Sequence, residues 1–152
     1  MTVVVGAPVD GTVVGLADLP DEVFAQEMVG AGTAVEPPPG ADRAVVLAPV
    51  AGTLSTLHPH AFVVGTPGGT AVLVHVGIDT VGLRGAPFTL HAARGDAVER
   101  GAPVLTVDLA AVRAAGCAVT CPVVVLDAPA GSVRAVAGEP VRAGAELFVW
   151  AP

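Results

Sequence analysis

The segment Ala7-Pro8-Val9-Asp10-Gly11-Thr12-Val13-Val14 occurs a second time, in altered form, as Ala48-Pro49-Val50-Ala51-Gly52-Thr53-Leu54-Ser55. A second motif, Gly95-Asp96-Ala97-Val98-Glu99-Arg100-Gly101, likewise returns as Gly138-Glu139-Pro140-Val141-Arg142-Ala143-Gly144. In each copy a proline or glycine interrupts short apolar runs, which is typical of strand, turn and strand. The repeats therefore predict a pseudo-duplicated unit built from strands.

The segments around the repeats extend the same pattern. Several are so uniformly apolar that neither face suits contact with water, which favours the interior of a sandwich. Six segments are predicted strands: 45–47, 62–64, 71–76, 104–107, 123–126 and 147–150. Only residues 21–26 and 108–115 are predicted to form short helices. Residues 36–42 are expected to form a loop. We expect an all-β fold, an antiparallel sandwich or barrel-like structure with a pseudo-duplicated strand-turn motif and very short helices.

The composition narrows the domain organisation and the partners. A chain of 152 residues suits one domain over residues 1–152. Its net charge is −7, it has no lysine, and its arginines are scattered. Because nucleic-acid binding needs a basic stripe, we expect no nucleic-acid partner, whereas the net negative charge suits a basic protein partner. No secretion signal or segment of about 20 apolar residues is evident, so we expect a cytoplasmic protein without direct membrane insertion.

Histidines mark the candidate site. His75 interrupts the apolar run Leu73-Val74-His75-Val76-Gly77-Ile78-Asp79-Thr80-Val81, and the pair His58-Pro59-His60 lies upstream. If 58–60 were strand, His58 and His60 would share a face, and a neighbouring strand could bring His75 beside them. A neutral imidazole nitrogen can attack phosphorus without a general base. Alternatively, imidazoles with the carboxylate of Asp79 could bind zinc.

Three segments resemble one protein family. The first segment is Val74-His75-Val76-Gly77-Ile78-Asp79-Thr80-Val81, followed by Leu83-Arg84-Gly85 and Phe88. The second is His60-Ala61-Phe62. The third is 19–30, in which the matching residues are Asp21, Phe24, Val29 and Gly30. The chain is similar in these segments to the glucose-type IIA components of the bacterial phosphoenolpyruvate-dependent sugar phosphotransferase system. The likeness extends from about Ala7 to Trp150.

The resemblance implies a phosphotransferase component of sugar transport that works through a phosphohistidine intermediate. His75 would accept a phosphoryl group from the histidine phosphocarrier protein and donate it to a cysteine of the IIB domain of a sugar permease, while His60 would hydrogen-bond that group. The same likeness implies a partner-docking surface formed by Asp21, Phe24, Val29, Asp79 and Val81. It requires no cofactor, although zinc could bind at His60 and His75. Where the family usually has a threonine, this chain has His58, a further potential zinc ligand.

Other functions fit parts of the sequence. His58-Pro59-His60 and His75-x-x-x-Asp79 resemble the ligand motifs of lysostaphin-type zinc peptidases, but in reversed order. A purely regulatory binding protein could use the same surface, with regulatory protein targets as partners. A biotin or lipoate carrier is excluded because the chain has no lysine to modify. We expect His91 to be a rim residue without a catalytic role.

Overall fold

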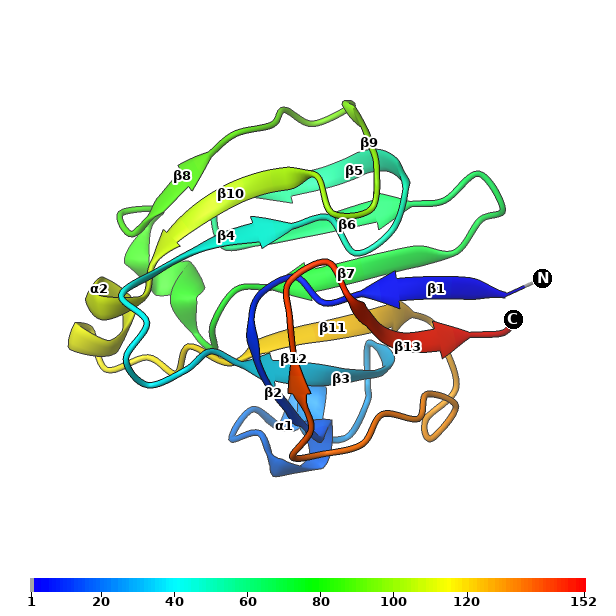
Figure 1. The fold of residues 1–152 in the computed structure, drawn as a ribbon, viewed down its shortest axis with the longest axis horizontal. Helices are drawn as coiled ribbons and strands as arrows, with labels where there is room; N and C mark the ends of the chain where they lie inside the picture. The colour runs from blue at the N-terminus through cyan, green and yellow to red at the C-terminus, as the bar shows by residue number, and fades with distance from the viewer. Residues whose placement is uncertain (1) are drawn as a thin grey trace.

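The computed structural model describes residues 2–152 and consists of strands with a few short helices (Figure 1). The strands are β1 (Val3–Gly6), β2 (Gly11–Val14), β3 (Gly30–Glu36), β4 (Arg43–Leu47), β5 (Gly52–His58), β6 (Ala61–Gly65), β7 (Ala71–His75), β8 (Phe88–Leu90), β9 (Ala97–Val98), β10 (Pro103–Asp108), β11 (Cys121–Leu126), β12 (Pro140–Val141) and β13 (Glu146–Trp150). The helices are α1 (Glu22–Ala25) and α2 (Leu109–Ala114), with 3-10 turns η1 (Leu16–Asp18) and η2 (Thr80–Leu83).

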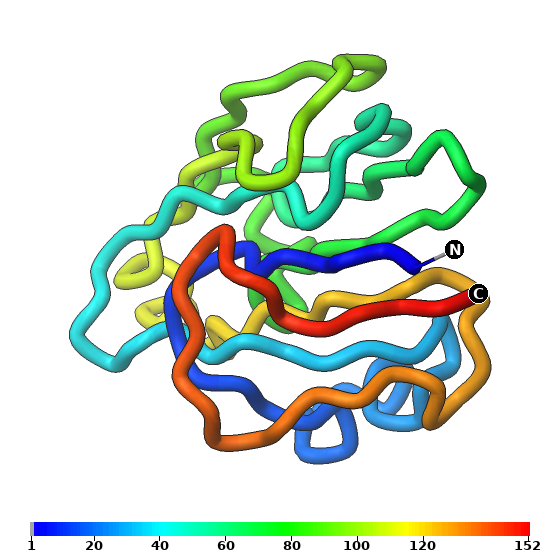
Figure 2. The backbone as a smooth tube through the Cα atoms, turned by 45° about the vertical axis from the view of Figure 1, so that its right-hand side comes forward, coloured from blue at the N-terminus to red at the C-terminus, as the bar shows by residue number. Residues whose placement is uncertain are grey.

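An eight-stranded antiparallel sheet carries the architecture. Its strand order is β12-β2-β3-β11-β7-β6-β5-β9. A three-stranded sheet, β4-β10-β8, and the ribbon β1-β13 complete the fold. The tube in Figure 2 shows the first and last strands, β1 and β13, running side by side, with Val3 opposite Trp150.

The repeats predicted this symmetry correctly. Reading the large sheet from its two ends, β12 and β2 mirror β9 and β5, and each of these four strands begins within one of the repeated motifs. A β-carbon on Gly11 would lie 2.1 Å from the carbonyl oxygen of Glu36, and one on Gly52 would lie 2.1 Å from that of Gly65. Neither site has room for a side chain, so both copies of the repeat begin their strand with glycine.

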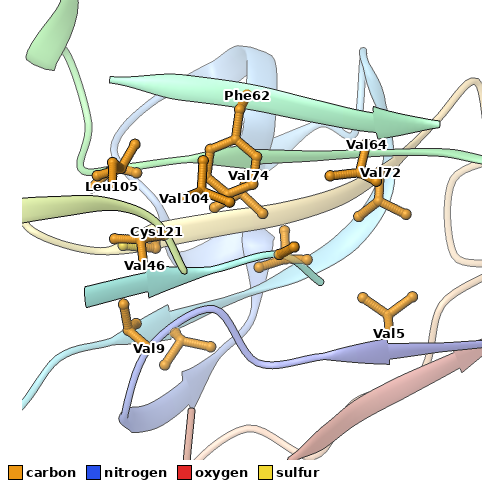
Figure 3. Close-up of a cluster of buried hydrophobic side chains, with 14 of the residues drawn as sticks. Val5, Val9, Val46, Phe62, Val64, Val72, Val74, Val104, Leu105 and Cys121 are labelled. Carbon is orange, nitrogen blue, oxygen red and sulfur yellow. The ribbon is translucent and has the colours of Figure 1, made fainter. Parts of the chain in front are cut away.

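The core lies between the large sheet and the two smaller sheets. Figure 3 shows valines, Phe62 and Leu105 from several strands packed together there. On β11, Val123 and Val125 face this main core, while Val124 packs into a second cluster under α1 and η1. Both faces of β11 are therefore covered, which explains its continuous apolar sequence.

The expected strands and both helices are present, and the all-β prediction is confirmed. One expectation about the site was wrong. Residues 58–60 do not form a continuous strand, because β5 ends at His58 and β6 begins at Ala61. Pro59 and His60 form the turn of this hairpin, and proline's fixed φ and missing N–H suit it to such a position.

Candidate active site

His75 is the last residue of β7, where the sheet gives way to a tight turn. Its cross-strand partner is Ala61 on β6, and the N–H of Val76 donates a 2.7 Å hydrogen bond to the carbonyl of His60. The β6–β7 pairing therefore fixes the backbone beside both histidines. His75 itself is half-buried.

The turn after His75 is held by its own backbone and side chains. Gly77 has φ +77°, and Asp79 has φ +61°, both in the left-handed region. The hydroxyl of Thr80, which is fully buried, donates a 2.7 Å hydrogen bond to the carbonyl of Val76. The N–H of Ile78 donates to the carbonyl of Ala118 at 3.0 Å. These contacts fix the position of the Gly77 carbonyl.

That carbonyl determines the protonation pattern of His75. Nδ1 of His75 lies 2.5 Å from the carbonyl oxygen of Gly77. A carbonyl can only accept, so Nδ1 carries the proton and the lone pair of the neutral ring resides on Nε2. Nε2 makes no hydrogen bond within residues 2–152, and no buried side-chain nitrogen among these residues lacks a partner. Nε2 is therefore not fully buried and carries a lone pair without a partner in this part of the chain.

The surroundings of His75 favour the neutral ring. Burial lowers its pKa below the ordinary value of 6.5. The hydrogen bond to Gly77 and the charges of Asp21 and Asp79 act in the opposite direction, but burial outweighs them. At neutral pH the nucleophilic form of His75 thus predominates.

His60 lies against His75, and His58 lies against His60. The ring centroid of His60 is 5.3 Å from that of His75, with the planes at 69°. The ring of His58 stacks on that of His60, at 5.7 Å and 21°. The pKa of His60 is lowered, first by burial and then by the charges of His75 and His58. The three imidazoles thus form a row, from His58 to His60 to His75, which arises from a hairpin turn and not from one strand face.

Helix α1 covers the other side of His75. Asp21 is its N-cap, and Oδ1 accepts hydrogen bonds from the N–H groups of Val23 and Phe24. The ring of Phe24 makes an edge contact with His75, with centroids 5.4 Å apart. Phe24 is only 8% exposed, so most of its ring packs against the second core cluster.

The other predicted docking residues lie around this centre. Asp79 is exposed at the N-terminal end of η2, and Val81 on η2 is 64% exposed. Val29 is half-buried and packs against the second core cluster. His91, by contrast, lies beyond β8 with its Nε2 2.6 Å from the hydroxyl of Thr106 on β10, outside the histidine cluster.

The arrangement offers a nucleophilic nitrogen beside a second imidazole. His60 and His75 could each supply one nitrogen to a metal ion. Among residues 2–152, however, no three His, Cys, Asp or Glu side chains are placed to hold one. The zinc site therefore stays a prediction, and a stable site would need ligands from elsewhere.

Sequence reasoning missed the roles of the Gly77 carbonyl and of Thr80. A main-chain acceptor has no residue-type signature, and only the turn geometry reveals it. The available signal was the Gly-Ile-Asp-Thr sequence itself, in which a glycine and an aspartate tolerate left-handed backbone.

Comparisons with known proteins identify the family and several relatives of this chain. The model of the family described as "phosphoenolpyruvate-dependent sugar phosphotransferase system, EIIA 1" matches residues 3–130. The chain is 41% identical over 121 residues to the "PTS system glucose-specific EIIA component" of Halalkalibacterium halodurans, covering 78% of this chain and 68% of that protein. It is 50% identical over 109 residues to the "PTS system glucose-specific EIICBA component" of Streptococcus pneumoniae, covering 70% of this chain but 14% of that protein.

A solved structure extends the likeness to the fold. The glucose permease IIA from Mycoplasma capricolum superposes with a TM-score of 0.85 at 32% identity, covering 98% of this chain and 96% of that one. Among the described residues, no helix is long and apolar enough to cross a membrane.

Proposed function

The chain belongs to the EIIA 1 family of the phosphoenolpyruvate-dependent sugar phosphotransferase system, and on this premise we propose that Nε2 of His75 is the atom that carries the phosphoryl group. Members of this family are phosphotransferase components that transfer phosphoryl groups through histidine in sugar uptake. The observation that carries the proposal is the hydrogen bond from Nδ1 of His75 to the Gly77 carbonyl, which leaves Nε2 free beside His60.

In the acceptance step, the donor is the phosphohistidine of the small phosphocarrier protein. The lone pair on Nε2 of His75 forms the new P–N bond while the P–N bond of the carrier breaks, and the carrier imidazole leaves with that electron pair. His75 loses no proton in this step, because Nδ1 keeps its proton and its hydrogen bond to the Gly77 carbonyl throughout. Catalysis then rests on alignment and on stabilisation of the phosphoryl charge, as phosphoryl transfer requires.

His60 is the group placed to stabilise the phosphoryl oxygens. Its ring lies against His75 and makes no side-chain hydrogen bond within residues 2–152, so an N–H is free to donate. A phosphoryl group on His75 brings about −2 charge, which favours donors and cations nearby. In the donation step, a cysteine thiolate of a IIB domain attacks phosphorus, and the electron pair of the P–N bond returns to Nε2.

The rim of the site suits a basic partner. The exposed carboxylate of Asp79 and the half-exposed one of Asp21 lie near His75, as their effect on its pKa requires. Exposed apolar side chains lie on the same elements: Val23 on α1 is 45% exposed and Val81 on η2 is 64% exposed. Charges that steer a partner and apolar contacts that hold it are the usual division of labour at an interface.

We infer that the phosphocarrier protein and a IIB domain bind this surface in turn. Support for the IIB partner comes from relatives whose printed names join the A, B and C components, such as the EIICBA component of Streptococcus pneumoniae. The same surface could hold regulatory proteins in a phosphorylation-dependent way. The permease selects the sugar, and a IIA component does not contact it, so the residues of this chain do not indicate which sugar is transported.

The test is phosphate transfer from phosphoenolpyruvate through the general phosphotransferase enzyme and the phosphocarrier. One acid-labile, base-stable phosphate per chain is expected. His75→Ala should take up none, His60→Ala should be labelled but donate slowly, and His91→Ala, the matched control outside the cluster, should behave as the wild type. Labelling of His75→Ala at the wild-type level would overturn the proposal.

A further inference from the structure

His58 stands at the end of a chain of ring contacts that runs through the site. Its ring stacks on His60, His60 lies edge-on to His75, and His75 lies edge-on to Phe24. Unlike His75, whose Nδ1 is tied to Gly77, the side chain of His60 makes no hydrogen bond within residues 2–152. Ring contacts are thus what orients His60.

The backbone that carries His58 is well fixed. His58 pairs with Ala61 across the hairpin, and Pro59 between them has a locked φ. Pro59 also packs closely on the segment after η2, because a β-carbon on Gly85 would lie 3.3 Å from its Cγ. The His58 ring therefore extends from a rigid platform, although the side chain itself is exposed.

The orientation of His60 needs such support. The χ2 torsion of histidine is broad and has no sharp staggered minima, so an unsupported ring swings and exchanges the positions of its nitrogens. A planar neighbour stacked at 21° restricts that swing. We propose that His58 is a positioning residue, which by stacking on His60 keeps the His60 ring oriented toward His75 for transfer of the phosphoryl group.

This inference rests on the proposed function, and it makes a separate prediction about the two transfer steps. Acceptance needs the lone pair of His75, which Gly77 fixes without any help from His58. Donation to a IIB domain needs a well-placed N–H of His60 on the phosphoryl group. Loss of the stack should therefore slow donation by about two- to tenfold and slow acceptance less.

The experiment compares His58→Phe, His58→Leu and His58→Ala. Phenylalanine keeps a planar ring without ionisable or metal-binding nitrogen, whereas leucine fills similar space without a plane. The rate of transfer from the phosphorylated protein to the purified IIB domain of the Streptococcus pneumoniae EIICBA component is measured by rapid quench. We expect phenylalanine to retain the wild-type rate and both leucine and alanine to lose about two- to tenfold.

A second readout needs no phosphate. The ring-proton resonances of His60 in the unmodified protein should shift in the alanine and leucine variants, because a stacked ring imposes a ring-current shift, and should shift far less with phenylalanine. A leucine variant that donates as fast as the wild type, or a phenylalanine variant as slow as alanine, would overturn the proposal. Unchanged His60 resonances in His58→Ala would also overturn the proposal. If no variant accepted phosphate, the proposed function would be refuted, and the resonances of His60 would still test the stacking proposal.

Discussion

Gly77 is the residue whose replacement should most clearly connect the turn to the chemistry. Its backbone has φ +77°, and a β-carbon there would lie 2.6 Å from Cγ2 of Thr80 and 2.8 Å from the carbonyl oxygen of Ala118. Both neighbours are held, since Thr80 is fully buried and the Ala118 carbonyl accepts a hydrogen bond from Ile78. Gly77→Ala therefore meets both backbone strain and a clash.

The two costs can be worked separately. A side chain in left-handed backbone costs about 1–2 kcal/mol. Forcing extra volume into a packed site costs about 1–3 kcal/mol. Gly77→Ala should thus lower the free energy of unfolding by about 2–5 kcal/mol. Relief of the clash should also displace the Gly77 carbonyl, which accepts the hydrogen bond from Nδ1–H of His75, and this displacement should slow labelling.

Two glycines in the same chain serve as matched controls. Gly69 has φ +93° but open space around a β-carbon, so Gly69→Ala carries the strain alone and should cost about 1–2 kcal/mol. Gly82, beside the site on η2, has neither problem, so Gly82→Ala should be nearly neutral. The assay is urea unfolding together with phosphate uptake. If Gly77→Ala loses no more stability than Gly69→Ala and is labelled at the wild-type rate, the reasoning is refuted.

Three further predictions follow from the same geometry. The pKa of His75 should lie below 6.5 in an NMR titration, because burial disfavours its charged form. The unfolded chain then binds more protons than the folded one, so the free energy of unfolding should fall as pH drops from 6.5 through that lowered pKa. A titration midpoint above 6.5 would contradict this prediction. Asp21→Ala and Asp108→Ala each remove a helix N-cap, and each should lower the free energy of unfolding by about 1 kcal/mol. Only Asp21→Ala should slow association with the phosphocarrier at low salt. Equal association rates for the two variants would exclude Asp21 from docking. Calorimetry with zinc should give equally weak binding for the wild type and His58→Ala, whereas a loss of affinity in the variant would identify His58 as a ligand.

The architecture was predictable because the features that determine it are visible in the sequence. Gly11 and Gly52 start equivalent strands where a neighbouring carbonyl excludes any side chain, so the repeat of sequence is a repeat of steric constraint. The apolar run of β11 likewise reflects burial on both of its faces. These are local or pairwise requirements, and residue types report them directly.

The site was predictable only in part. The sequence indicated that three imidazoles meet, but it assigned His58 and His60 to one strand, whereas Pro59 and His60 form a turn. Phe24 was expected in a docking patch, and the structure places most of its ring in the core with an edge on His75. Ring orientations and the acceptor carbonyl of Gly77 depend on backbone geometry across several elements, which residue types do not encode.

The most direct test of the account is to determine which nitrogen carries the phosphorus. After phosphorylation through the phosphocarrier, ¹⁵N-labelled protein should show phosphorus coupled to Nε2 of His75, with Nδ1 still protonated and hydrogen-bonded to Gly77. Phosphorus on Nδ1 of His75, or on any other histidine, would contradict the claim that this hydrogen bond sets the nucleophile.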